Sequence, residues 1–87
     1  MKQHSHIIVG IHVTDRVKHA GVIQKVLTQY GSNIKTRVGL HDITDNLASN
    51  GIILLEMVGN ERLCLTILKT LNAIKGVEAK KMVFSHD

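Results

Sequence analysis

Histidine offers the clearest prospect of chemistry in this chain, which has six histidines among 87 residues. His4 and His6 form an H-x-H pair, and alternate residues of a strand lie on one face, so the two imidazoles can approach one ion. His86 and Asp87 join them if the first and last strands are antiparallel neighbours. Neutral imidazoles with a carboxylate suit zinc, nickel or copper. The sequence therefore predicts a metal site of His4, His6 and His86, and the alternative is two solvated chain ends.

The other histidines admit simpler explanations. We expect His12 and His41 beside Gly10 on an exposed sheet face. There they would either complete a site shared by two subunits or pack and hydrogen-bond in an interface. His19 lies in the first turns of an expected helix, where we expect it to be solvated.

Catalysis has no recognisable motif in this sequence. Cys64 lies within an apolar stripe, and no basic partner is close enough in sequence to indicate a thiolate, which predicts a buried structural thiol and not a nucleophile. The serines belong to no nucleophile motif, the carboxylates form no pair, and the glycines form neither a dinucleotide fingerprint nor a P-loop. We therefore expect no catalytic residues, no enzyme activity and no cofactor other than a metal ion.

Length and composition predict one small domain that spans residues 1–87 and associates with itself. A chain of this size buries only about 60% of its unfolded surface, yet 44% of its residues are apolar. Part of that apolar surface is expected to lie against another copy, in a dimer or tetramer. The single cysteine fits a reducing cytoplasm, and no apolar run approaches the roughly 18 residues that a membrane span needs.

Hydrophobic periodicity predicts six elements in the order βαββαβ. The strands are residues 5–13, 33–41, 51–58 and 77–84, and the helices are residues 15–31 and 60–76. Thr14 or Asp15 and Asn60 are the expected N-caps, and Gly31 and Gly76 the expected left-handed residues at the helix ends. The stripe of the first helix is Val17, Ala20, Ile23, Leu27 and Tyr30, widened by Val22 and Val26; that of the second is Leu63, Cys64, Ile67, Leu68, Leu71 and Ile74.

The two halves of the chain repeat one unit, because both helices have the same length from cap to glycine and their apolar positions coincide. Two βαβ units with right-handed crossovers predict an α+β, ferredoxin-like sandwich with an antiparallel sheet of order 4-1-3-2 and both helices on one face. We expect the uncovered face to present Ile8, His6, His12, Gly10, Arg37 and one side of the third strand. An apolar centre with a polar rim is typical of an interface.

Nucleic-acid binding is not expected from the sheet. RNA-binding domains of the same element order stack bases on aromatic side chains in the first and third strands, and these strands contain no aromatic residue. The positive charges are dispersed, with a net charge of +4. No helix-turn-helix is recognisable either, so regulation of transcription would act through a partner.

One resemblance covers almost the whole chain. It rests on Asp15-Arg16 after the first strand, Gly31 through Ile34 after the helix, Arg37 and Gly39 in the second strand, and Gly51 at the start of the third. The sequence resembles the small stand-alone ACT-like proteins known as iron-only hydrogenase system regulators. These are related in fold to ACT domains and to the C-terminal domain of the nickel-responsive regulator. The resemblance implies an oligomeric, non-catalytic regulatory or ligand-sensing domain.

The resemblance also implies a place for the ligand, because ACT-like folds bind ligands near the first strand-to-helix turn and a subunit contact. Thr14, Asp15 and Arg16 occupy that turn, and the amides at a helix N-terminus favour a carboxylate or another anion. Arg37, Gly39 and His41 would complete the site from a neighbouring subunit. The expected ligand is a small molecule such as an amino acid. The alternatives are a metal-responsive module for nickel or zinc and a protein-interaction adaptor without a ligand.

Overall fold

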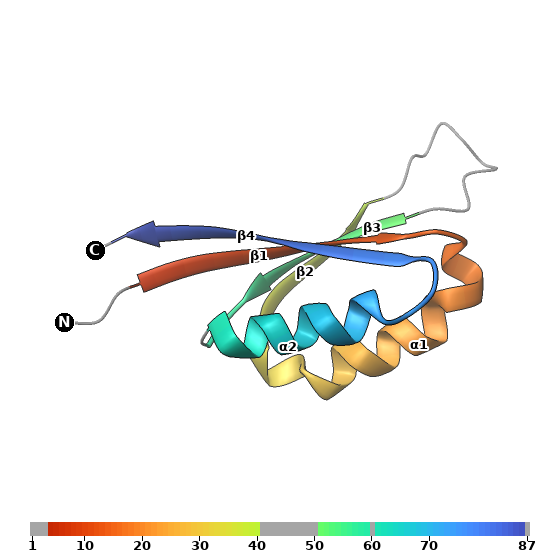
Figure 1. The fold of residues 1–87 in the computed structure, drawn as a ribbon, viewed down its shortest axis with the longest axis horizontal. Coiled ribbons are helices and arrows are strands. Elements are labelled where there is room, and N and C mark those ends of the chain that lie inside the picture. The colour runs from red at the N-terminus through yellow and green to blue at the C-terminus, as the bar shows by residue number, and fades with distance from the viewer. Residues whose placement is uncertain (1–3, 41–50, 60, 87) are drawn as a thin grey trace.

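A computed structural model describes residues 4–40, 51–59 and 61–86 (Figure 1). Its elements are β1 (His4–Val13), α1 (Arg16–Gln29), a 3-10 turn (Gly31–Asn33), β2 (Ile34–Leu40), β3 (Gly51–Met57), α2 (Glu61–Asn72) and β4 (Val77–His86). The order βαββαβ confirms the predicted arrangement. Neither described helix has the length and apolarity that a membrane crossing requires.

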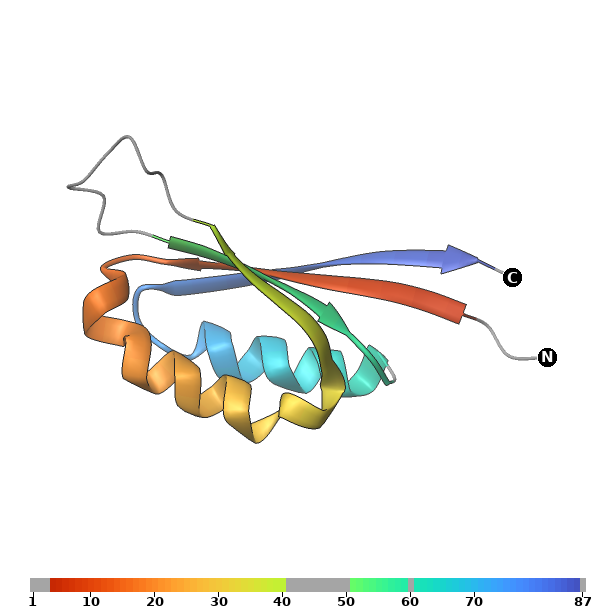
Figure 2. The same cartoon turned by 180° about the vertical axis from the view of Figure 1, so that it is seen from behind.

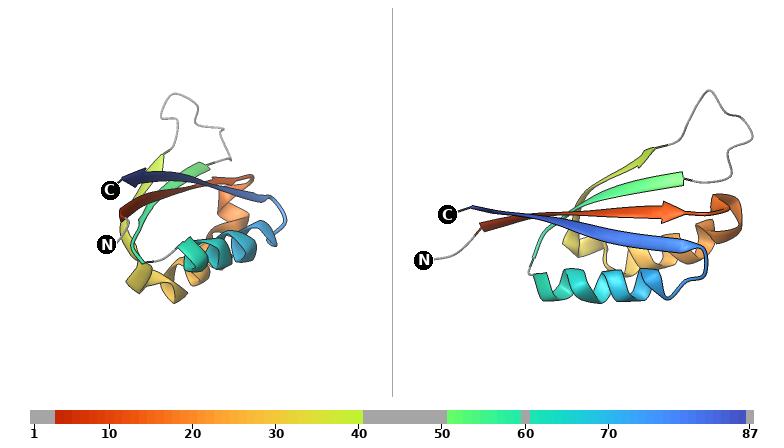
Figure 3. Two further views of the ribbon diagram at one scale, coloured as in Figure 1. Left: turned by 60° about the vertical axis from the view of Figure 1, so that its left-hand side comes forward. Right: turned by 45° about the horizontal axis from the view of Figure 1, so that its top comes forward.

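The sheet has four antiparallel strands in the order β2-β3-β1-β4, which confirms the predicted ferredoxin-like α+β fold. Both helices lie on one face of the sheet, and no described element covers the other face (Figure 3). β1 pairs with β4 from His4 to Val13, but with β3 only from Ile7 onward. The paired ends of β1 and β4 therefore extend past the helices, toward the two chain termini (Figure 1).

The core lies between the helices and the covered face of the sheet. Alternate residues of β1 are buried there, and they pack against Ile23, Val26 and Leu27 of α1 and against Ile67 and Leu71 of α2. The second predicted stripe is confirmed, but the first is too wide, because Ala20 and Val22 are exposed. Two helices above four strands leave room for only one narrow stripe of α1.

The helix ends differ from the symmetric prediction. Asp15 precedes α1 with a φ of 55°, and its side chain makes no hydrogen bond to the described amides of the first turn. Gly31 is not left-handed: α1 ends at Gln29, the next residue Tyr30 has a φ of −103°, and a 3-10 turn begins at Gly31. Gly76 has a φ of 88° and closes the turn that leads from α2 into β4. The two halves therefore share their strands and helices but not their turns.

A β-bulge in β2 reverses one predicted face. Ile34 pairs with Met57 and Thr36 pairs with Glu56, so that Lys35 is an extra residue and the register shifts. A bulge bends its strand and re-aims the side chains that follow it, and β2 curves strongly in Figure 2. Arg37 consequently lies opposite buried Leu55, on the side of the helices. The expectation that Arg37 belongs to the uncovered face is wrong.

The edge of β4 is shielded by one side chain of α2. The Asn72 amide donates to the backbone oxygen of Ala79 at 3.1 Å, and its Oδ1 accepts the Ala79 N–H at 2.8 Å. The pair of bonds imitates a neighbouring strand and satisfies backbone groups that an edge would otherwise expose.

Candidate functional site

A groove lies between the second half of α1 and β2, with a volume of about 320 Å³. Leu27 and Thr28 line it from α1, and Ile34, Lys35 and Arg37 line it from β2. The volume is close to the roughly 300 Å³ at which small-molecule pockets begin. The groove therefore combines an apolar lining with two cationic side chains at the edge of the sheet.

Arg37 is held in this groove by the fold. The bulge at Lys35 turns Arg37 toward α1, where its Nη1 donates to Oε1 of Gln24 at 3.3 Å. The bond uses one of the five guanidinium donors, and the other N–H groups can still bind a carboxylate or phosphate in pairs. Lys35 adds a second cation, although its Nζ also lies 3.9 Å from Glu56. The groove is therefore suited to a small anion.

The predicted turn after β1 is organised by other contacts. The Thr14 N–H donates to the Gly76 oxygen at 2.8 Å, so that this amide is already bonded. The Asp15 oxygen accepts from the N–H groups of Lys18 and His19, as the first intrahelical bonds require. Arg16 begins α1, and the described part of its geometry is limited to the backbone.

His19 joins this turn and was not predicted to do so. Its Nδ1 lies 2.8 Å from the Thr14 oxygen and 3.2 Å from the Asp15 oxygen. Carbonyl oxygens only accept, so Nδ1 carries a hydrogen. The ring is also close to Gly76, where an added Cβ would lie 2.9 Å from its Cε1. His19 therefore fixes the two connections at this end of the sheet, which single-sequence periodicity does not reveal.

The six predicted ligand residues fall into two groups. Val13 pairs with Gly51 and Leu40 pairs with Ile52, so that the turn after β1 and the end of β2 lie at the same end of the sheet, on either side of β3. A Cβ added at Gly39 meets no described atom within 4 Å. The close approach of a ligand or of another backbone that was expected at Gly39 therefore stays a prediction. Arg37 instead bonds to Gln24, about 12 Å along α1 from Arg16. His41 lies outside the described residues.

For the predicted metal site, the structure describes the backbone of all three histidines but the side chain of His6 alone. His4 and His86 are direct cross-strand partners, and His6 pairs with Phe84. The chain ends are therefore neighbours, as the sequence predicted, and His6 is exposed. Among the described residues, no group of three histidine, cysteine or carboxylate side chains forms a metal site. The side chains of His4 and His86 lie outside the description, so metal binding stays a prediction.

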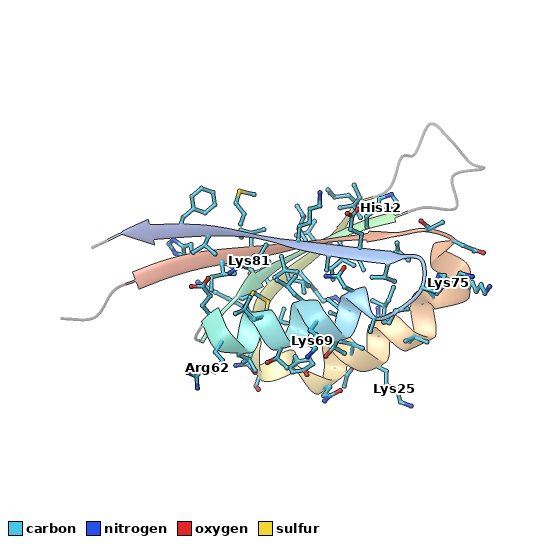
Figure 4. The ribbon with its side chains drawn as sticks, viewed as in Figure 1. His12, Lys25, Arg62, Lys69, Lys75 and Lys81 are labelled. Carbon is cyan, nitrogen blue, oxygen red and sulfur yellow. The ribbon has the colours of Figure 1, made fainter. Side chains whose placement is uncertain are left out.

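A second hollow, of about 270 Å³, lies on the open face of the sheet. It forms where Gly10 lacks a side chain, and His12, Ile52, Glu78 and Lys80 surround it. Glu78 and Lys80 lie 3.8 Å apart as an exposed ion pair. Figure 4 shows His12 on this side of the sheet, whereas Lys25, Arg62 and Lys69 project from the helices on the opposite side.

Comparison with known proteins supports the fold. No protein-family model and no curated protein matches the sequence. Among solved structures, the uncharacterized protein TM1266 from Thermotoga maritima superposes with a TM-score of 0.78 and 23% sequence identity, over 95% of this chain and 99% of that chain. CPII, a nitrogen regulatory PII-like protein from Thiomonas intermedia K12 bound to ADP, AMP and bicarbonate, superposes with a TM-score of 0.67 and 10% identity, over the full length of both chains. At these identities the similarity shows a shared fold.

Proposed function

We propose that this chain is a non-catalytic ligand-sensing domain that acts as a homo-oligomer and binds a small anion in the groove between α1 and β2. The observation that carries the proposal is Arg37, which the bulge directs into an apolar groove beside Lys35. The fold is shared with CPII, whose described ligands are ADP, AMP and bicarbonate, all of them anions. Thr14, Asp15 and Gly39 at the nearby sheet end would contact the outer part of a larger ligand.

The regulatory role is part of the same proposal. The resemblance to iron-only hydrogenase system regulators favours control of such a system or of transcription, in the cytoplasm and through a protein partner. Regulation through a protein partner does not require this chain to bind nucleic acid directly. Ligand binding in the groove would act on the partner protein indirectly. It would change either the end of the sheet at Thr14 and Gly39 or the assembly of the subunits.

The test is isothermal titration calorimetry of the chain with amino acids, AMP, ADP and bicarbonate. We expect one class to bind with a dissociation constant below about 1 mM, which corresponds to a binding free energy of about −4.1 kcal/mol or stronger. Arg37→Met should weaken that binding by about 10-fold to 100-fold, because a hydrogen bond to a charged group contributes about 1.5–3 kcal/mol. Lys25→Met is the matched control, since Lys25 is an exposed cation of α1 that points away from the sheet (Figure 4). Absence of heat with every anion at millimolar concentration would leave the protein-interaction adaptor as the better function.

A metal-responsive function is the second candidate, and the cross-strand pairing of His4 with His86 favours it. The same titration with nickel and zinc chloride separates the two candidates. A metal response that disappears in a His4→Ala, His6→Ala variant, but persists in Arg37→Met, would assign sensing to the chain termini.

A further inference from the structure

The open face of the sheet carries most of the exposed apolar surface. Nine large apolar side chains are exposed in the described part of the chain, and six of them lie on this face: Val38, Leu40, Ile52, Leu54, Met82 and Phe84. Ile8 adds a half-buried seventh. Apolar surface left in water costs about 25 cal/mol per Å², so that this face is suited to a protein partner.

The strand register arranges the face as a grid of four rows across β2, β3, β1 and β4. The first row is Leu40, Ile52, His12 and Glu78; the second is Val38, Leu54, Gly10 and Lys80; the third is Thr36, Glu56, Ile8 and Met82; the fourth holds His6 and Phe84. Apolar side chains fill the β2–β3 half of the first two rows, and Ile8, Met82 and Phe84 make the β1–β4 half of the last two rows apolar apart from His6. Polar or small residues occupy the two remaining quarters, one of which holds only Thr36 and Glu56.

This checkerboard restricts how a second copy of the chain can cover the face. A two-fold axis parallel or perpendicular to the strands places every apolar quarter against a polar quarter of the other copy. An axis along a diagonal places apolar quarters against apolar quarters. The strands of the two sheets then cross steeply, which is the orthogonal class of sheet packing and not the aligned class.

Charge distinguishes the two diagonals. An axis from Glu56 toward Glu78 would place each of these carboxylates against its own copy. An axis through Leu40, Leu54, Ile8 and Phe84 instead places Glu56 over Gly10 of the second copy, in the hollow that Lys80 and His12 border. Lys35, beside Glu56, then lies toward Glu78 of the second copy. The second diagonal pairs opposite charges and fills the hollow.

The size of the face is close to what such a contact needs. The fourteen positions of the grid, each about 4.8 by 6.7 Å, cover roughly 450 Å² on each copy. The total of roughly 900 Å² lies near the lower bound of about 1,000 Å² for a specific interface. Thr36, Lys80 and His12 lie at the border of the grid, as the polar rim of such interfaces does.

We propose that the open sheet face binds a second copy of the chain as a two-fold dimer with steeply crossed strands, in which Glu56 of each copy enters the hollow over Gly10 of the other, beside Lys80 and His12. This assignment deepens the proposed homo-oligomer and does not depend on the ligand of the groove.

The first test exchanges the charges. Glu56→Lys and Lys80→Glu should each weaken the dimer at least 10-fold in sedimentation equilibrium, because each places like charges together twice. An equimolar mixture of the two variants should form heterodimers with nearly native affinity, since both contacts are then between opposite charges. Within one chain Glu56 and Lys80 are two strands apart, so an effect on folding alone cannot produce this rescue. A mixture that stays monomeric overturns the assignment.

The second test determines along which diagonal of the grid the two-fold axis lies. Leu40→Cys should be joined to its own copy by a short thiol-to-thiol crosslinker, because Leu40 lies on the proposed axis. Glu78→Cys should not be joined, because it lies at the far corner. The native chain is the control, since its Cys64 is buried. The reverse pattern would overturn the chosen diagonal.

The third test identifies the face. Leu54→Asp should abolish the dimer, and Leu65→Asp, which changes an equally apolar exposed residue of α2, should leave it intact. If the native chain is monomeric at about 50 µM, the assignment is overturned. The partner of the open face is then a different protein. Ligand calorimetry remains a separate measurement, so failure of the dimer and failure of the sensor are distinguishable.

Discussion

The two faces of the sheet are built from the same strands but differ in burial and in side-chain composition. Leu55 on the covered face is fully buried, and its neighbour Leu54 on the open face is 36% exposed. From Ile7 to Val13, the covered face of β1 contains only aliphatic side chains, whereas the open face between His6 and His12 mixes Ile8 with Gly10 and these two histidines. The difference shows that the covered face specifies the fold of one chain and that the open face is available for contacts between chains.

The largest effect is expected from the two adjacent leucines. Leu55→Ala should destabilise the chain by about 2–5 kcal/mol, because it removes buried methyl groups and leaves a cavity. Leu54→Ala should cost less than about 1 kcal/mol at dilute concentration, since its side chain is already partly solvated. Urea unfolding measures both.

The same pair also sharpens the comparison with concentration. If the open face is an interface, the stability lost in Leu54→Ala should grow as the protein concentration rises, because association stabilises only the native chain. The loss in Leu55→Ala should depend on concentration much less. Equal losses at every concentration would contradict the division between the faces.

The next effect concerns the turn that closes the covered layer. Gly76→Ala should destabilise the chain by about 1–3 kcal/mol, because its φ of 88° is unfavourable for a side chain and the new Cβ would approach His19. Gly21→Ala is the matched control in α1, where no described atom lies within 4 Å of the added Cβ. It should stabilise the chain by about 0.4–1 kcal/mol through the unfolded state. Thermal unfolding followed by circular dichroism compares the two, and a stabilising Gly76→Ala would contradict the role of this turn.

The smallest effect is expected from the thiol inside the covered layer. Burial raises the pKa of Cys64; Lys81 opposes this shift and Glu61 adds to it. The folded chain therefore keeps the thiol neutral at pH values where the unfolded chain ionises it. This contribution to stability is complete below about pH 8.5, the usual pKa of a free thiol, and is lost as pH rises toward the higher pKa of the folded state.

Cys64→Ala isolates that contribution. The native chain should lose more stability than this variant between about pH 8 and pH 10 in urea unfolding, because only the native chain has a thiol that ionises more readily when the chain unfolds. Parallel losses would show that Cys64 does not contribute. The buried thiol should also react slowly with a thiol reagent in the native state.

Much of the fold could be predicted from local patterns in the sequence. Alternation along β1 and β4, the stripe of α2 and the repeated βαβ unit led to the observed strand order. Gly76 was expected to be left-handed, and it is. His19 was expected to be solvated, but it is partly buried, bonds to two backbone oxygens of the turn before α1 and lies close to Gly76, which only the tertiary structure brings beside it.

The candidate site was less predictable than the fold. The role of Arg37 in ligand binding stays a prediction, and the face predicted for Arg37 was wrong, because one extra residue at Lys35 reverses the alternation that follows. A bulge leaves no reliable mark in one sequence, since lysine is also common at ordinary edge positions. Thr14, Asp15 and Gly39 were placed correctly at one end of the sheet, and their contact with a ligand stays a prediction.

The sequence by itself determined which elements form and most of the residues that are inside, because burial follows the periods of 2 and 3.6 residues that apolar side chains repeat. Only the tertiary structure decided which side chains meet across strands. The direction of Arg37 depends on a register shift against β3, and the checkerboard of the open face depends on how four separate strands align. Both are properties of pairs of distant segments, and local periodicity carries no information about their alignment.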